Sequence, residues 1–297
     1  MNNLPDEIIF KILITTPDFI KNFNSYTLIN KRFSNIAQNI IEFYHRKILN
    51  ITANCKYKPK KLIEVLFHNN ELDDIIFLTN NFNLTKYTSY YAGRYNNLYI
   101  LNYLNTINIP QLIKGSVENG NLNIMKQYKD HLEYFDYFKI AKAAGRSCNI
   151  TVINYISSIS EEFNNWIAYG IAQKGDIELL KYIINKNADD YLGMAVNAAK
   201  TGQLNIIKYA VEVLNCDNLK IICHTAIIKN YLEVIKYIIS KGLNDHNWIA
   251  FNASLYDNLD IIKFTIINGA NNYEQILSNL NKDKRNELVL FIKQLNQ

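Results

Sequence analysis

The sequence lacks the cysteine patterns that mark secreted disulfide frameworks and zinc sites. Its four cysteines, Cys55, Cys148, Cys216 and Cys223, are scattered, and no two lie within three residues of each other. This spacing contains no Cys-x-x-Cys pair and indicates a reducing compartment. The nearest group of possible ligands, Cys216, Cys223 and His224, matches no zinc pattern, so we expect no bound metal.

Features of secretion and membrane insertion are also missing. The N-terminus, MNNLPDEIIF, carries two acids and no basic region, which argues against a signal peptide. No apolar run approaches the length that spans a bilayer. We therefore expect a soluble, intracellular protein that makes no contact with a membrane.

Common motifs of catalysis and nucleotide binding are absent as well. The sequence has no GxGxxG, P-loop, GxSxG or HExxH pattern. Its acidic residues are dispersed, and no pair can be assigned the roles of general acid and general base. The sequence therefore predicts a protein that is not an enzyme, with no catalytic residue and no cofactor.

Isoleucine and asparagine are abundant, with 45 and 44 residues, against only 10 Gly and 4 Pro. Hydrophobic residues make up 48% and charged residues 20% of the 297 residues, which is typical of a folded protein. The net charge of +5 is mildly basic. A nucleic-acid binder would have to gather this charge into a patch or a stripe.

A pattern of about 27 residues recurs along most of the chain. It is clearest in NAAKTGQLNIIKYAV (197–211), which predicts the end of one helix, a left-handed turn at Gly202 and a second helix from Leu204. Equivalent apolar anchors recur every 24 to 28 residues, which indicates a solenoid. The anchors are Leu72, Leu98, Leu122, Ile150, Ile177, Leu204, Leu232 and Leu259.

Other positions of the repeat agree with this interpretation. The residues two positions before the anchors are Asn70, Asn96, Gly120, Cys148, Gly175, Gly202, Asn230 and Asp257. All except Cys148 are types that tolerate the left-handed conformation. Small residues in the first helices let neighbouring helices approach closely, among them Ala143, Ala144, Ala168, Ala172, Ala195, Ala199, Ala226, Ala250 and Ala253. We expect four residues to cap first helices: Asn165, Asp190, Asn218 and Asn247.

Segments such as GQLNIIKYAVE and GDIELLKYIINKNAD resemble the second half of an ankyrin repeat, and Asn268-Gly269-Ala270 ends its repeat as that family does. The likeness covers about residues 60 to 275. Two departures are repeats shorter than the family's 33 residues and the missing Thr-Pro-Leu-His start. The resemblance implies an all-α solenoid of about eight helix-turn-helix repeats, with the β-fingers reduced or absent. Short repeats rich in Asn and Ile are most similar to ankyrin-repeat families of giant viruses that infect amoebae, and if the protein is viral this resemblance implies the host cytoplasm.

A different motif precedes the repeats. LPDEIIFKIL is followed by a break at PDF and then by TLINKRFSNIA. This order resembles the F-box, a three-helix module with a Leu-Pro-x-Glu start and a later Lys-Arg-Trp/Phe segment, here with Phe in place of the commoner Trp. The resemblance implies docking onto the Skp-type adaptor of a cullin ubiquitin ligase. The residues that this resemblance implies in docking are Leu4, Pro5, Glu7, Ile8, Ile12, Leu13, Leu28 and Phe33.

We therefore expect four parts: the F-box-like module (1–50), a junction (51–58), the repeat array (59–275) and C-terminal capping helices (276–297). Beyond the repeats, helices are expected over 273–280 and 287–295, separated by the polar loop NKDKRN. Residues 1–50 have a second interpretation, in which they form a helical cap that shields the first repeat.

Two positions of the second helices carry the same residue type in most repeats, one a lysine column and the other an aromatic column, and either could contact a ligand. Lysines recur at 126, 181, 208, 236 and 263, but acids at 178, 233 and 260 lie three residues before Lys181, Lys236 and Lys263 and would partly neutralise the column. A solvated face is therefore favoured over phosphate contacts. Aromatic residues recur at 103, 155, 182, 209, 237 and 264. Inter-repeat packing is favoured for them over a stacking platform for bases.

A solenoid without a reaction centre functions by binding, at the starts of its first helices and in its inter-repeat loops. The candidates for target binding are Trp166, Tyr169, Asp189, Asp190, Asp217, Asp245, His246 and Trp248. The two tryptophans lie in matching segments, Asn-Trp-Ile-Ala. They are either contact anchors or, as the favoured alternative, the first buried residues of their helices.

These observations lead to three hypotheses. The first is an adaptor that recruits an unknown target protein through the repeats and binds a Skp-type protein through residues 1–50. The second is an ankyrin-like scaffold without a role in ubiquitin transfer. The third, a solenoid that binds nucleic acid, is disfavoured and predicts steeply salt-dependent binding. We expect the protein to be a monomer.

Overall fold

A computed structural model describes residues 59–82 and 84–295. These residues are helical and contain no strand, which confirms the predicted all-α fold with its β-fingers absent from the described part. The chain divides into two compact units, residues 1–140 (unit 1) and 141–297 (unit 2), and each is described by itself. The F-box-like segment lies outside the described residues.

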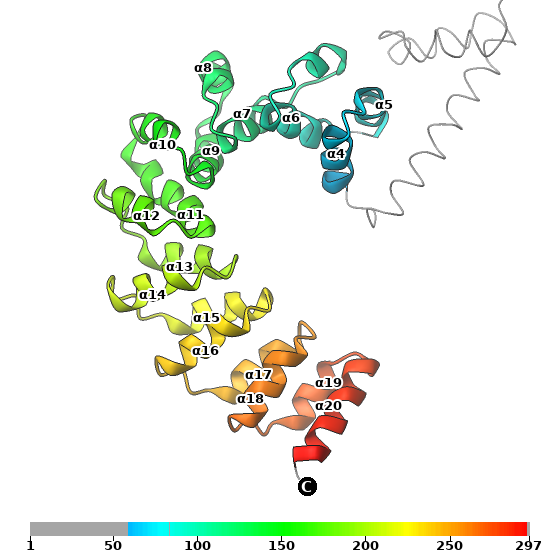
Figure 1. Cartoon of the computed structure of the whole chain (residues 1–297), viewed down its shortest axis with the longest axis vertical. Coiled ribbons are helices and arrows are strands. Elements are labelled where there is room, and N and C mark those ends of the chain that lie inside the picture. The colour runs from blue at the N-terminus through cyan, green and yellow to red at the C-terminus, as the bar shows by residue number, and fades with distance from the viewer. Residues whose placement is uncertain (1–58, 83, 296–297) are drawn as a thin grey trace, which may run out of the picture. The chain divides into compact units, whose positions relative to one another are not determined.

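The described part of unit 1 contains three helix pairs and the start of a fourth (Figure 1). Two of the second helices are short, one a 3-10 helix of 5 residues and the other an α-helix of 6 residues. The elements are α4 (Pro59–His68), α5 (Leu72–Phe82), α6 (Thr85–Arg94), η1 (Tyr99–Tyr103), α7 (Ile109–Glu118), α8 (Asn123–Tyr128) and η2 (Lys129–His131), followed by α9 (Tyr134–Ser147), which continues into unit 2.

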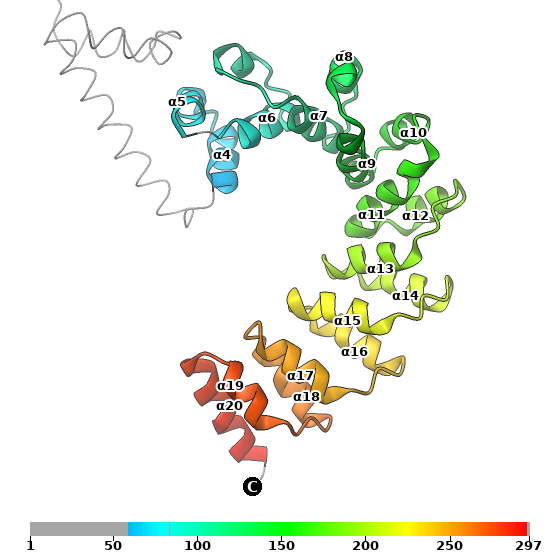
Figure 2. The same ribbon diagram turned by 180° about the vertical axis from the view of Figure 1, so that it is seen from behind.

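Unit 2 continues the alternation of first and second helices as far as the last described pair. The elements are α10 (Ile150–Ser157), η3 (Glu161–Phe163), α11 (Asn164–Lys174), α12 (Ile177–Ile184), α13 (Tyr191–Ala199), α14 (Leu204–Glu212), α15 (Leu219–Ile228), α16 (Leu232–Ser240), α17 (His246–Ser254), α18 (Leu259–Ile267), α19 (Tyr273–Asn279) and α20 (Lys282–Leu295). The first helices α11, α13, α15, α17 and α19 pack consecutively in one layer (Figure 2).

The left-handed turn predicted between the two helices of each repeat is confirmed at all eight positions. The backbone φ angle is positive in every case, from 49° at Cys148 to 82° at Gly120. A backbone hydrogen bond closes the turn in the same way in several repeats, as from Gln203 N to Ala198 O (3.0 Å). Cys148, which the residue type did not favour, adopts the conformation of the other seven turns.

Replacing Cys148 by glycine should therefore stabilise unit 2 by about 1 kcal/mol, because glycine has no Cβ to clash at positive φ. The measurement is the urea midpoint of unfolding. Asn230→Gly is the matched control and should change the midpoint less, since asparagine tolerates a positive φ. A lower midpoint for Cys148→Gly would show that the thiol makes contacts that outweigh the strain.

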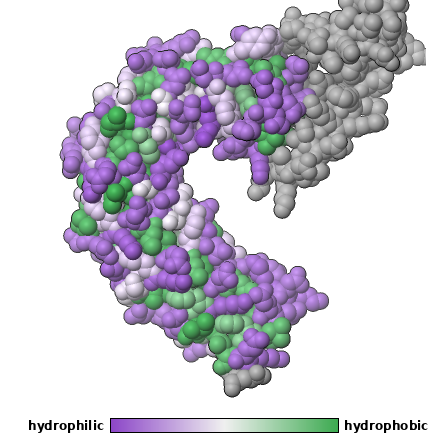
Figure 3. All heavy atoms as spheres, in the orientation of Figure 1, coloured by the Kyte–Doolittle hydropathy of each residue, from purple (hydrophilic) through white to green (hydrophobic). Residues whose placement is uncertain are grey.

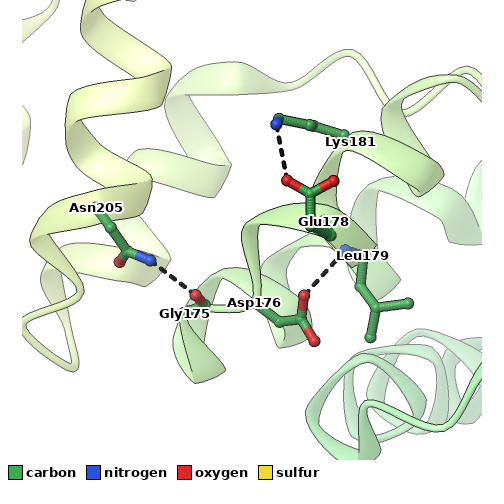
Figure 4. Close-up of polar contacts among 6 residues, drawn as sticks. All are labelled: Gly175, Asp176, Glu178, Leu179, Lys181 and Asn205. Carbon is green, nitrogen blue, oxygen red and sulfur yellow. Dashed lines mark hydrogen bonds and ion pairs between the residues drawn. The ribbon is translucent and has the colours of Figure 1, made fainter.

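The turn at Gly175 shows how one repeat is bonded to the next (Figure 4). Asp176 caps α12 by accepting a hydrogen bond from Leu179 N at 3.0 Å. In the following repeat, Asn205 Nδ2 donates to Gly175 O at 2.8 Å. Glu178 and Lys181, one turn apart on the surface of α12, form an ion pair at 2.8 Å. The carbonyl at the end of the first helix is thus bonded by the neighbouring repeat.

Two details of the C-terminal pair differ from the prediction. Helix α20 begins at Lys282, five residues before the expected start at Glu287, so most of the segment NKDKRN is helical. The physical reason is a cap, because Asn281 Oδ1 accepts a hydrogen bond from Lys284 N at 3.1 Å. Lys263 pairs with Glu287 of α20 at 2.7 Å and not with Asp260, as the local spacing suggested.

Candidate functional site

The first helices of unit 2 begin along one edge of their layer, because each follows an inter-repeat loop and each ends at a left-handed turn. We call this edge the first-helix edge and define it as the N-terminal parts of α11, α13, α15 and α17 with the loops that precede the last three of these helices. All eight predicted target-binding residues belong to it: Trp166, Tyr169, Asp189, Asp190, Asp217, Asp245, His246 and Trp248.

Asparagine side chains connect consecutive loops of this edge. Asn165 Oδ1 accepts hydrogen bonds from Asp189 N (2.9 Å) and Asp190 N (3.0 Å), and its Nδ2 donates to Asp189 Oδ1 (3.0 Å). Three repeats later, Asn247 Oδ1 accepts from Asn271 N (2.8 Å) and Asn272 N (3.3 Å). The prediction that Asn165 and Asn247 are helix caps is therefore wrong: they bind the backbone of the following repeat.

Three of these helices have side-chain caps, Asp190 on α13, Asn218 on α15 and Asp245 on α17, whereas no side chain caps α11 in the described structure. Asp190 accepts from Gly193 N (2.8 Å) and Asn218 from Ile221 N (3.4 Å), which confirms both predictions. Asp245, and not Asn247, caps α17 by accepting from Trp248 N (3.0 Å). The loops are therefore fixed by side-chain bonds to the backbone in place of β-fingers.

Trp166 lies at the surface, with 37% of the residue exposed, so the favoured prediction of a buried tryptophan is wrong. Its ring meets the ring of Tyr169 edge-on, with centroids 5.4 Å apart. The Tyr169 hydroxyl donates to Asp190, and the ring lies against Gly193. Burial and then this carboxylate raise the pKa of Tyr169 well above its usual value. Trp166, Tyr169 and Asp190 thus form one aromatic and acidic cluster.

Trp248 is half-buried, and two residues of the preceding repeat border its ring. Lys220 Nζ lies 4.7 Å from the ring centroid, and the His224 ring centroid lies 6.2 Å away. Lys220 and His224 were not predicted as site residues. Their spacing from Trp248, about one repeat, is the signal that would have found them. His246, the first residue of α17, is also half-buried.

A polar network borders the edge on α9, α11 and α13 and was also not predicted. Asn197 Oδ1 accepts hydrogen bonds from Lys142 Nζ (2.6 Å) and Gln173 Nε2 (3.1 Å). Asn197 Nδ2 donates to Gly193 O (2.8 Å). Lys142 Nζ also lies 5.9 Å from the centroid of the Tyr169 ring. These contacts fix the position of an ammonium group beside Tyr169.

The lysines of the second helices are engaged within the array. Four of the five predicted lysines each lie over an aromatic ring of the next repeat, at 5.5 to 5.8 Å from the centroid. Tyr182 and Tyr237 also donate hydrogen bonds to the preceding repeat, to Asn154 (2.6 Å) and Glu212 (3.1 Å). The geometry supports packing for the aromatic column and a compensated face for the lysines. The lysine and ring pairs are Lys181 with Tyr209, Lys208 with Tyr237, Lys236 with Phe264, and Lys263 with Phe291.

Within the described ranges, no three His, Cys, Asp or Glu side chains come together as metal ligands would. The helices described there are too short or too polar to cross a bilayer. Cys223, in α15, is fully buried, and burial raises the pKa of its thiol to about 12. This thiol is a packed core group.

The raised pKa of Cys223 gives a prediction for stability. Above pH 9 the unfolded thiol loses its proton while the folded thiol keeps it, so the folded state binds more protons and stability falls as pH rises. Between pH 8 and pH 10 the loss from this group is on the order of 1 kcal/mol. Urea unfolding of the wild type and Cys223→Ala at both pH values measures it. An equal pH dependence in the two proteins would contradict the assignment.

On the side seen in Figure 3, hydrophobic areas are small and separated by hydrophilic ones. Exposed apolar residues of the first helices of unit 2 and of the residues that end them are few and spread along the layer, although Leu255 is followed by the exposed Tyr256. Besides Trp166 they include Ile221 (44% exposed), Ile228 (39%) and Leu255 (52%). A partner would therefore meet isolated apolar contacts among charged and polar groups.

Comparison with known proteins agrees with the helical repeat architecture. A scan against models of known protein families finds no match. A protein of Acanthamoeba polyphaga mimivirus, described as an ankyrin repeat protein, is 23% identical over 257 residues, which cover 75% of this chain and 39% of that protein. The chain thus matches about two fifths of the length of its viral relative. The predicted ankyrin-like helical array is supported by both the structure and this similarity.

Proposed function

We propose that the chain is a protein-interaction scaffold whose first-helix edge holds a target protein. The observation that carries this proposal is the succession of aromatic and acidic groups at the starts of first helices in unit 2, among them the exposed Trp166 and Asp217 and the half-buried Trp248. Trp166 and Trp248 stand on helices, and the loop of Asp189 and Asp190 is bonded to Asn165 of the preceding repeat. A rigid, extended surface of this kind suits the binding of another protein.

We further propose that residues 1–50 dock a Skp-type adaptor and thereby link the bound target to a ubiquitin ligase. The support is the motif itself, with Leu4, Pro5 and Glu7 at its start and Phe33 near its end. Apolar residues of a short three-helix module leave a small core that a partner completes. The viral relative contributes the repeat architecture to this argument and nothing about ubiquitin.

The experiment is a binding assay between the purified full chain and a purified Skp-type adaptor. The full chain should bind, and a variant lacking residues 1–50 should not. Leu13→Ser should weaken the complex at least about tenfold, because it removes an apolar contact, whereas Asn3→Ala serves as the matched control and should bind normally. Binding by the shortened variant would contradict the proposal.

The same variants decide between the adaptor and the helical cap. If residues 1–50 only shield the first repeat, their removal lowers the free energy of unfolding of the repeats, and the adaptor binds neither protein. In that outcome the scaffold function of the repeats stands and the link to a ubiquitin ligase is lost.

A further inference from the structure

We propose that the first-helix edge recognises a partner segment in which lysine or arginine residues alternate with apolar residues. This inference rests on the proposed scaffold function and names the class of segment that the edge binds. Three observations carry it: cations already lie over two aromatic rings of the edge, no described lysine or arginine forms an ion pair with the aspartates of the edge, and apolar side chains lie exposed between them.

The first observation is the position of two ammonium groups of the chain itself. Lys220 Nζ lies 4.7 Å from the centroid of the Trp248 ring, and Lys142 Nζ lies 5.9 Å from that of Tyr169. Both distances are within the range of cation–π attraction. Lys220 is exposed and is not held by a carboxylate in the described structure, so an arriving lysine or arginine can take its place over the Trp248 ring.

The second observation is uncompensated negative charge. In the described structure, the side chains of Asp189, Asp190 and Asp245 accept hydrogen bonds only from neutral donors, which are backbone N–H groups, the Asn165 amide and the Tyr169 hydroxyl. Asp217 is exposed. On the second helices the acids are instead paired with lysines, as in Glu178 with Lys181 (2.8 Å) and Glu233 with Lys236 (2.7 Å). The partial positive charge at each helix start offsets only part of the aspartate charge.

The third observation is apolar exposure next to these charges. Trp166 is 37% exposed and Ile221 is 44% exposed, and each stands in the first turn of a helix that follows an acidic loop. A purely basic partner would leave these side chains in water. A segment that also carries apolar side chains would cover them, and the burial would add to the electrostatic attraction.

The same charges argue against other classes of partner. Phosphate groups of a nucleic acid would meet the aspartates, and so would an acidic segment. Lysines do gather at the opposite ends of the same helices, at Lys174, Lys200 and Lys229. The basic part of the partner must therefore lie at the N-terminal ends of the first helices, over Trp166, Ile221 and Trp248.

Both tryptophans of the chain lie at this edge, so intrinsic fluorescence reports its occupancy. The full chain is titrated with three unlabelled peptides, built from repeated Leu-Lys-Ser-Lys, Leu-Glu-Ser-Glu and Ser-Lys-Ser-Lys units. The first should change the tryptophan emission saturably. The acidic peptide should bind at least about tenfold more weakly, because its charges repel the edge. The peptide without leucine should also bind at least about tenfold more weakly.

Variants then locate the binding. Lys220→Ala removes the internal competitor and should tighten binding of the basic, apolar peptide about threefold, whereas Asp217→Asn should weaken it about threefold. Trp166→Phe keeps only Trp248 and should retain a saturable signal. The matched controls are Glu178→Gln and Ile267→Ser, an acid and an exposed apolar residue of the second helices, and neither should change the affinity.

Equal binding of the three peptides, preference for the acidic one, or equal effects of the control variants would overturn the inference. So would Lys220→Ala with unchanged or weaker binding. The scaffold function is tested separately, by capture of protein partners from host extract with the full chain. If the chain captures protein partners but shows no preference for the basic, apolar peptide, this inference is refuted and the scaffold function stands. If the chain captures no protein, the proposed function is refuted.

Discussion

Replacing Gly145 by alanine will destabilise unit 2 by about 3 kcal/mol. Gly145 of α9 and Gly170 of α11 face each other where the two helix backbones meet. A Cβ on Gly145 would lie 2.0 Å from Ile167 O and 2.9 Å from Gly170 Cα, and these atoms belong to the backbone of α11. Because no flexible side chain can move aside, the helices must separate and lose the packing around Ala168.

The sign of the effect distinguishes this account from helix propensity. Alanine is a better helix former than glycine by about 1 kcal/mol, so propensity alone predicts that Gly145→Ala stabilises the protein. Urea unfolding followed by circular dichroism gives the sign. Gly269→Ala is the control, because a Cβ there meets no atom within 4 Å and only the strain of its positive φ, about 1 kcal/mol, remains. A Gly145→Ala protein of wild-type stability would refute the close approach of α9 and α11.

Replacing Asn165 by alanine will cost about 2 kcal/mol, although the residue is only half-buried. The change removes three hydrogen bonds to the next repeat, two from the backbone amides of Asp189 and Asp190 and one to the Asp189 carboxylate. The amides of the loop then have no partner from α11. Because the loop connects α12 to α13, its loosening weakens the contact between consecutive repeats.

Asn268→Ala is the matched control for this prediction. Asn268 is exposed, and its side chain donates one hydrogen bond within its own helix, to Phe264 O at 2.7 Å. Its replacement should cost less than about 0.5 kcal/mol. Equal losses for the two variants, measured as free energies of unfolding, would show that Asn165 makes no special contribution between repeats.

The sequence was sufficient for features that depend on neighbouring residues. The left-handed turns follow from Gly, Asn and Asp at a fixed distance before each anchor, and the caps at Asp190 and Asn218 follow from side chains that reach three residues ahead. At Cys148 the position in the repeat, and not the residue type, determines the left-handed backbone conformation, because the helices on both sides must meet their neighbours.

Several side-chain partners that belong to the next repeat were predicted incorrectly. Asn165 and Asn247 have the composition of caps, but their bonds reach residues 24 and 25 positions later. Lys263 has an acid three residues before it and pairs instead with Glu287. A residue at the start of a first helix can face its own turn or the following loop, and the spacing within one helix does not distinguish these two cases. The identical segments around Trp166 and Trp248 were the available signal.

The most direct test of the repeat array removes one complete repeat. Deletion of residues 204–231 joins Gln203 to Leu232, so that α16 takes the place of α14 and Lys181 meets Tyr237 in place of Tyr209. The account predicts a protein with unchanged helix content per residue and cooperative unfolding, whereas deletion of residues 204–217 alone, which places a first helix where a second belongs, abolishes cooperative unfolding. Loss of cooperative unfolding on removal of the complete repeat would contradict the account.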